Sequence, residues 1–483
     1  MSAVPPIPAV ALGQLRRRPA AFAGLAAAQL LALATVTLFG SLLAADLTAP
    51  AGTPRAASGP GVAVVAAGFG EIAVLVAFFV VANALGFALR QQHRELALLR
   101  AAAATPRQIR RLVRGEVLAT TLLVALPGWA LGHLAAGRFL TALQRRDMAA
   151  PTLAVPGSPL PGLAALAAAL LVGLAASAVG ARRISRTTPA AALTGSAADP
   201  GRTGAVRLLA GVAVLVGGGL LLRLAATRPA DQLDKAGQAA LLGSLVLLVA
   251  VALLGPLAAR ALVAGLGAPL RAAAPRTGWL ADANLRGHAH RLASAVVPVA
   301  LLTGLSGTMT IMTTTAERAA ERATAHAAEL SAELSTGLTT GPAASSVTSA
   351  SDIWLRQAEL AMLVCFATVA TVNTLVALTV DRRREFALLR LAGATRHRLL
   401  AVLGVEAVLT AAVGVLLGAG VAAAASAAFS TAVTGTMAPA VPAAACGWIA
   451  GGALVLTLPG ILVPALWATT GPAAALVAGG GRD

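Results

Sequence analysis

The heptapeptide Arg-Glu-Leu-Ala-Leu-Leu-Arg at Arg94–Arg100 returns 290 residues later as Arg-Glu-Phe-Ala-Leu-Leu-Arg at Arg384–Arg390. The same interval relates three further pairs of identical residues: Thr105 and Thr395, Glu116 and Glu406, and Asn83 and Asn373. Ten of the 23 positions from Arg94 to Glu116 are identical in the second copy. Alanine-rich composition alone does not reproduce ordered charges, so the pattern indicates an internal duplication.

The composition places this duplication in a membrane protein. Hydrophobic residues make up 58% of the 483 residues and charged residues only 12%, with a mean hydropathy of +0.81. Such a chain is too apolar for a set of soluble domains and too poor in charge for disorder. Aromatic residues are 3% with no tyrosine, which leaves almost no stacking surface for single-stranded nucleic acid, so we expect no nucleic-acid partner.

Ten apolar stretches approach the length of about 20 residues that a membrane-spanning helix needs. They are Ala20–Ala45, Val62–Leu89, Val117–Leu134, Pro161–Gly180, Leu208–Leu222, Ala239–Ala259, Leu292–Met312, Leu355–Val380, Leu399–Ala425 and Ala443–Trp467. The fifth is the shortest. Because the first exceeds the apolar core of a cleaved secretory signal, we expect it to remain as a span.

The duplicated unit contains four spans. A weaker echo, Ile184–Leu193 against Trp467–Leu476, closes each copy. The sequence therefore predicts an all-α polytopic membrane protein of about ten helices, in which two four-helix repeats are joined by two linking helices. The expected boundaries are 1–195 for the first unit, 196–275 for the linker and 276–483 for the second unit.

Basic residues are distributed unevenly between alternate connecting segments. One side carries 27 of the 37 lysine and arginine residues and the other side carries 10. Since positive charge accumulates on the cytoplasmic side, this asymmetry predicts that both termini and both repeated segments are cytoplasmic.

The repeated segments, at 90–115 and 381–405, mix arginine with leucine at helical spacing. In the first copy Thr105 is a candidate helix cap, with Gln108 positioned to complete a capping box. In the second copy Gly393 marks an elbow and Thr395 the cap, so both copies predict a helix, a sharp bend and a second helix. Arginine alone would suit anionic lipid headgroups. The repeated Arg-Glu pairs favour a docking site for a cytoplasmic protein.

The sequence Arg-Glu-Phe-Ala-Leu-Leu-Arg-Leu-Ala-Gly-Ala-Thr at Arg384–Thr395, with four spans per unit and Thr-Thr-Pro-Ala-Ala-Ala-Leu at Thr187–Leu193, resembles the FtsX-like permease family of ABC transporters. The resemblance implies that the repeated segments contact a separate ATPase subunit. The residues that it assigns to this coupling role are Glu95, Arg100, Thr105, Arg107, Glu385, Arg390, Gly393, Thr395 and Arg396. The first copy departs from the pattern, with Ala103 where the second has Gly393.

The sequence contains no recognisable catalytic motif. A phosphate-binding Walker loop needs a lysine after a glycine-rich turn, whereas the single lysine, Lys235, follows Asp234. Histidines lack partners at metal-ligand spacing. We therefore expect no enzymatic activity, no metal and no cofactor in this chain. We expect ATP and Mg²⁺ to bind the partner ATPase. Because there are two coupling segments, we expect two copies of the ATPase for each permease chain.

Polar residues inside spans are expensive and merit separate attention. Glu71 is a candidate for a substrate path. Asn83 and Asn373 are candidates for hydrogen bonds between the repeats or, less favoured, for ligand contacts. The segment Thr313–Arg356 predicts a helical extension followed by a loop, which is too small for a folded external domain.

These features predict the membrane subunit of an exporter in a bacterial cytoplasmic membrane, moving a hydrophobic or amphiphilic molecule such as an antibiotic, peptide or lipid. One alternative is a signalling complex that transmits ATPase motion to an external partner without transport. Another is an ion-driven transporter, which would need carboxylates near the membrane midplane.

Overall fold

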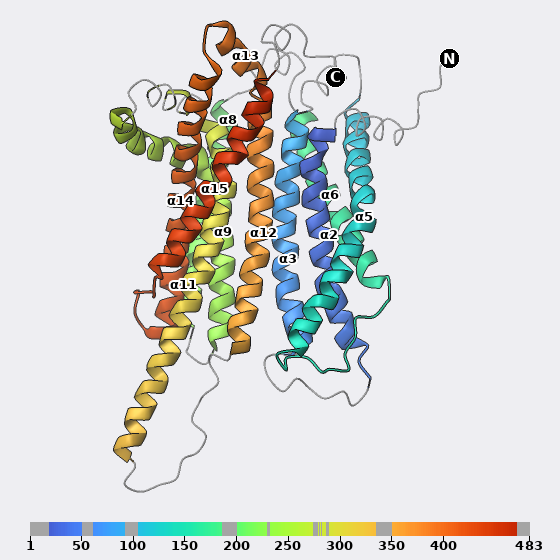
Figure 1. Cartoon of the computed structure of the whole chain (residues 1–483), viewed down its shortest axis with the longest axis vertical. Coiled ribbons are helices and arrows are strands. Elements are labelled where there is room, and N and C mark those ends of the chain that lie inside the picture. Colours follow the sequence, from blue (N-terminus) through green and yellow to red (C-terminus); the bar gives the residue numbers. More distant parts are fainter. Residues whose placement is uncertain are drawn as a thin grey trace. The chain divides into compact units, whose positions relative to one another are not determined.

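The computed structural model describes residues 19–50, 61–91, 105–185, 200–228, 232–273, 279, 281, 283–285, 289–334 and 350–470. Within these ranges the regular structure is helical and no strand occurs (Figure 1). The helices group into two compact units, which are described one at a time.

The first unit is a bundle of four helices. They are α2 (Pro19–Leu47), α3 (Val62–Gln91), α5 (Pro106–Gln144) and α6 (Leu160–Ser185). Helix α2 contacts each of the other three, most extensively α5 and α3. Three phenylalanines, Phe39, Phe69 and Phe139, join α2, α3 and α5 through edge-to-face ring contacts with centroids 5.7 to 6.4 Å apart, a favourable aromatic geometry.

The second unit repeats this arrangement and adds to it. Its helices are α8 (Pro200–Ala226), α9 (Leu233–Ala273), α11 (Ala289–Leu334), α12 (Ala350–Val380), α13 (Arg383–Leu391), α14 (Arg396–Thr434) and α15 (Ala443–Ala468). Helices α11, α12, α14 and α15 pair with one another as α2, α3, α5 and α6 do. The two copies of the duplicated sequence therefore correspond to two similar four-helix bundles in the structure.

The two linking helices belong to the second unit. Helix α9 packs against α11 and α14. On α8, the Arg207 guanidinium donates to the Leu253 and Ala252 carbonyl oxygens of α9, each at 2.9 Å. Helix α8 has 27 residues, so the fifth span is longer than the predicted Leu208–Leu222.

Among the described residues, nine helices are long and apolar enough to cross a membrane. Helix α6, with 26 residues, takes the place of the remaining predicted span, and its described apolar part is Leu160–Ala175. The chain is thus an all-α polytopic membrane protein. The predicted extension beyond the seventh span is helical, since α11 continues to Leu334, while most of the loop that was expected after it lies outside the described residues.

Glycines allow the closest helix contacts in both units. On α14, a Cβ at Gly414 would overlap Val299 of α11, and one at Gly418 would overlap the Thr303 side chain and the Ala300 backbone. The motif Gly414-x-x-x-Gly418 therefore lies where α14 approaches α11 most closely, as small residues at such spacing allow. The first unit has Gly128 at the position that the 290-residue interval relates to Gly418, and a Cβ there would overlap Leu33 of α2.

We predict that Gly418→Val separates α14 from α11 and lowers the stability of the second unit by about 1–3 kcal/mol, a common cost of overpacking. Gly420→Val is the matched control, because Gly420 lies on the same helix and a Cβ there would meet nothing within 4 Å. Thermal unfolding in detergent measures both variants. An equal loss of melting temperature in the two would contradict the close-packing role.

Candidate coupling site

The repeated segment of the second unit folds as a short helix followed by a sharp elbow. Helix α13 has nine residues and lies at the end of the unit opposite the long free end of α11 (Figure 1). It ends in a Schellman motif: the Ala394 N–H donates to the Leu389 carbonyl oxygen at 3.0 Å, and the Gly393 N–H to the Arg390 carbonyl oxygen at 3.1 Å. Gly393 has φ +94°, a left-handed conformation that favours glycine.

Threonine caps the helix after the elbow in both copies, as predicted. The Thr105 hydroxyl oxygen accepts from the Gln108 N–H at 3.3 Å, and the Gln108 side-chain oxygen accepts from the Thr105 N–H at 2.8 Å. This is a complete capping box. In the second unit the Thr395 hydroxyl oxygen accepts from the Arg398 N–H at 3.4 Å. The elbow of the first copy, with Ala103, lies outside the described residues.

Arg382, at the turn between α12 and α13, joins the coupling helix to α14. Its Nη1 donates to Glu406 Oε2 at 2.6 Å and its Nη2 to Glu406 Oε1 at 3.4 Å. Its Nε donates to Glu385 Oε2 at 3.2 Å. Asn284, which precedes α11, donates from Nδ2 to Glu406 Oε1. One guanidinium thus holds carboxylates from α13 and α14 together.

This cluster is largely sealed from solvent. The exposed fraction is 4% for the Glu406 side chain, 18% for Arg382 and 36% for Glu385. Burial by itself lowers the pKa of the Arg382 guanidinium, but the charges and hydrogen bonds of Glu406 and Glu385 outweigh it and raise that pKa above its ordinary value. Arg382 therefore remains a cation, and the buried charge is compensated from two sides.

Apolar packing also holds α13 in place. The Arg382 guanidinium lies over the Phe386 ring, 5.3 Å from its centroid, within the range of a cation–π contact. Phe386 is 1% exposed and packs in a cluster with Leu375 of α12, Leu403 of α14 and Ile461 of α15. Helix α13 is consequently packed against three spans, α12, α14 and α15.

Two arginines tie the elbow to the segment that closes the unit. Arg390 Nη1 donates to the Thr469 carbonyl oxygen at 2.9 Å, and Arg396 Nη2 donates to the Thr470 carbonyl oxygen at 3.1 Å. The two motifs that the sequence repeats, the Arg-Glu heptapeptide and the closing Thr-Thr segment, therefore meet in space. Charge-assisted bonds to carbonyl oxygens at a helix end also satisfy groups that lack helical partners.

Three leucines are exposed on α13 and at its end. Leu388, Leu389 and Leu391 are 50%, 42% and 56% exposed, while Glu385 and Arg390 are engaged with their own chain. Sequence reasoning missed these leucines because it weighed only the charges. The repetition of Leu388 and Leu389 as Leu98 and Leu99 was the signal that could have found them.

The other predicted site residues are dispersed. Arg107 is exposed at the start of α5, and Glu71 is exposed on α3; Asn83 on α3 and Asn373 on α12 are half-buried. Glu95 and Arg100 lie outside the described residues. No sequence pattern pointed to Glu359, a carboxylate on α12 that is 9% exposed and lies one turn from Arg356. Within the described part of the chain, no three His, Cys, Asp or Glu side chains gather as a metal site would require.

We predict that Glu406→Gln lowers the stability of the second unit by about 3 kcal/mol, since it removes the main counter-charge of a buried guanidinium. Glu385→Gln is the control on the same guanidinium and should cost less than about 1 kcal/mol, because Glu385 is partly exposed. Thermal unfolding of the purified protein compares them. A larger loss in Glu385→Gln would overturn the assignment of Glu406 as the principal partner.

Comparison with known protein families supports the duplication. The profile described as FtsX-like permease C-terminal matches twice, at residues 67–189 and 359–472. The first match spans most of α3 together with α5 and α6, and the second spans most of α12 together with α13, α14 and α15. A search of curated proteins found no match. With one permease domain in each bundle, the chain belongs to the FtsX-like permease family, the membrane permeases of ABC-type systems.

Proposed function

We propose that this chain is the membrane subunit of an ABC exporter, which receives force from two copies of a separate cytoplasmic ATPase and moves a hydrophobic or amphiphilic molecule. The repeated segments would face the cytoplasm, as would both termini, in the cytoplasmic membrane of a bacterium. ATP and Mg²⁺ would be held by the ATPase. The chain itself would act without catalysing a reaction.

The observation that carries this proposal is the attachment of α13. An ATPase that pushes on a flexible loop would only bend it, whereas α13 is bonded through Arg382 to α14 and through Arg390 to the end of α15. Movement of α13 must therefore displace these helices. Over the 39 residues of α14, about 58 Å at 1.5 Å per residue, that displacement would reach the other side of the membrane.

The exposed leucines of α13 supply the contact surface. An apolar centre within a polar rim is the usual anatomy of a specific interface. Here Leu388 and Leu389 are exposed, and so are Arg383 and Arg384 of the same helix and Arg398 of α14. The ATPase would then present a hydrophobic groove with acidic margins.

A substitution at this surface tests both the docking and the copy number. In the double variant Leu388→Glu with Leu389→Glu, we expect the ratio of ATPase to permease in complexes purified from the native membrane to fall from two to one. Adding Leu98→Glu and Leu99→Glu in the first copy should remove the second ATPase. Quantitative mass spectrometry measures the ratio, and ATP hydrolysis by the purified complex should fall with it.

Val441→Glu is the control, since Val441 is equally exposed at 52% but lies in the α14–α15 connection at the other end of the unit. It should retain both ATPase copies. The proposal fails if the wild-type complex contains no ATPase, or if the four leucine substitutions leave the ratio unchanged.

A second function, signalling without transport, is favoured by the length of α11. This helix has 46 residues, and residues 321–329 at its far end are all exposed, as a docking stalk for an external protein would be. Deletion of 329–349 separates the two functions. A signalling complex would lose its response while ATPase stimulation persists, whereas an exporter would continue to move its substrate.

A further inference from the structure

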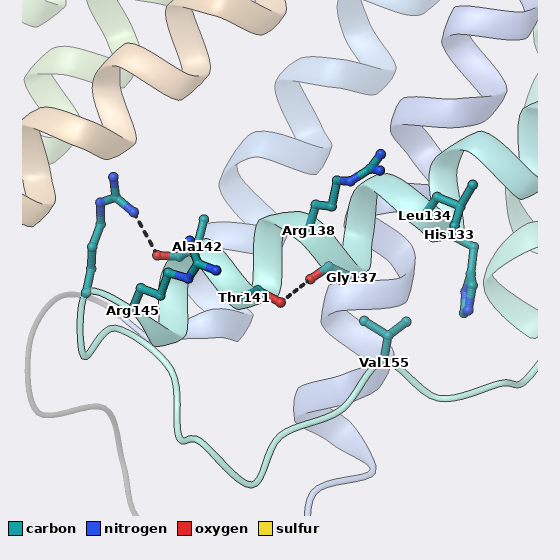
Figure 2. A pocket seen from close by; sticks show the side chains of 9 residues that line it. His133, Leu134, Gly137, Arg138, Thr141, Ala142, Arg145 and Val155 are labelled. Atoms are coloured by element: carbon teal, nitrogen blue, oxygen red, sulfur yellow. Dashed lines mark hydrogen bonds between the residues drawn. The ribbon is translucent and has the colours of Figure 1, made fainter.

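A cationic cleft lies at the end of α5 that is farthest from the coupling segment. It has a volume of about 600 Å³ and is lined by the last turns of α5 and by Val155 of the returning loop. Figure 2 shows His133, Arg138 and Thr141 following one another along the helix, and Val155 on the loop beside it. None of these residues takes part in the coupling site.

Side-chain contacts fix both the loop and the helix turns that line the cleft. Gln144 Nε2 donates to the carbonyl oxygens of Ala150 at 3.0 Å and Leu153 at 2.8 Å, which secures the loop that carries Val155. At the inner end, the Trp129 ring stacks on His133 with centroids 5.9 Å apart. Trp129 is itself packed so closely on α6 that a Cβ at Gly162 would overlap its indole.

Two arginines in the cleft form no ion pair with any described carboxylate. Arg138 lies in the penultimate turn of α5 and Arg145 is its C-cap residue; both are exposed. No described carboxylate comes within ion-pair distance of either guanidinium. Arg146, whose Nη1 donates to the Ala142 carbonyl oxygen at 3.0 Å, adds a third positive charge. A helix C-terminus stabilises cations within its last turn, which accounts for Arg145 and Arg146 but not for Arg138.

The position of these arginines also departs from the trend of the whole chain. The connecting segments on this side carry only 10 of the 37 basic residues, and three of those ten are Arg138, Arg145 and Arg146. Arg138, Arg145 and Arg146 all line the cleft, and a guanidinium group matches phosphate and carboxylate geometry. The chemistry of the lining therefore selects an anion.

Exposed leucines continue the same face of α5 toward the membrane interior. Leu123, Leu126 and Leu134 are 67%, 71% and 59% exposed. Their spacing in the sequence places them on the same side of the helix as Arg138. Leu134 both ends this leucine stripe and lines the cleft. The predicted third span also ends at Leu134, which would place the arginines at the depth of the headgroup layer.

We propose that this cleft binds the phosphate or carboxylate head of a membrane amphiphile, whose hydrocarbon part lies along the leucine stripe. The inference rests on the membrane assignment and narrows the substrate class of the proposed exporter to amphiphiles with an anionic head. A water-soluble anion would use the arginines without needing the stripe. The amphiphile is favoured because the cationic and apolar surfaces are continuous.

Binding can be measured on the purified full-length chain without any ATPase, so failure of ATP coupling would leave this test intact. The protein is extracted from bilayers of phosphatidylglycerol and phosphatidylcholine, and retained lipids are identified by native mass spectrometry. The wild type should retain phosphatidylglycerol in preference. In Arg138→Gln with Arg145→Gln, that retention should fall at least about tenfold, since two charge-assisted contacts are lost.

Arg318→Gln with Arg322→Gln is the matched control, because it also removes two exposed arginines from one helix; it should retain phosphatidylglycerol like the wild type. Arg138→Lys with Arg145→Lys should keep most of the binding. If the glutamine variant does not fold, Leu134→Gln tests the stripe at an exposed position and should weaken retention. Equal lipid retention in cleft and control variants would overturn the proposal, and so would displacement of the lipid by inorganic phosphate alone.

Discussion

The ion pair between Arg382 and Glu406 is the constraint on which the position of α13 depends. A guanidinium that is 18% exposed is costly to bury unless carboxylates surround it. Here the two carboxylates come from different helices, α13 and α14, so the charge is balanced only when the coupling helix lies against the span. Packing of Phe386 beneath the same guanidinium adds an apolar contact that would be lost if α13 lifted away. Electrostatics and packing thus select one position for the helix.

The two duplicated bundles share the same pattern of helix packing. In each four-helix bundle the first helix, α2 or α11, packs against the other three helices of the bundle, and glycines on α5 or α14 bring the backbones close. Close-packed helices transmit displacement because they resist deformation. A push on α13 is therefore received by a bundle rather than by a single helix. Glu116, 3% exposed like Glu406, occupies the equivalent position on α5.

Features with local causes were predictable from the sequence. Thr105 and Thr395 cap their helices because a threonine hydroxyl accepts a free N–H of the first turn, and Gly393 forms the elbow because the left-handed conformation favours glycine. Features with distant causes were not. The bond from Arg382 to Glu406 joins residues 24 apart, and the tie from Arg390 to Thr469 depends on residues 79 apart. The cleft at Arg138 depends on the path of the loop that carries Val155, and composition alone does not predict that path.

The most direct test of the central claim is a distance distribution between α13 and α14 in solution. Spin labels at Leu391→Cys and Leu416→Cys, both exposed positions, are introduced after the native cysteines Cys365 and Cys446 are replaced by serine, and pulsed electron resonance records the separation. A rigid attachment predicts one narrow distribution that broadens when Glu406→Gln is added. A distribution that is already broad in the chain with Glu406 intact would contradict the account, because α13 would then move independently of the span.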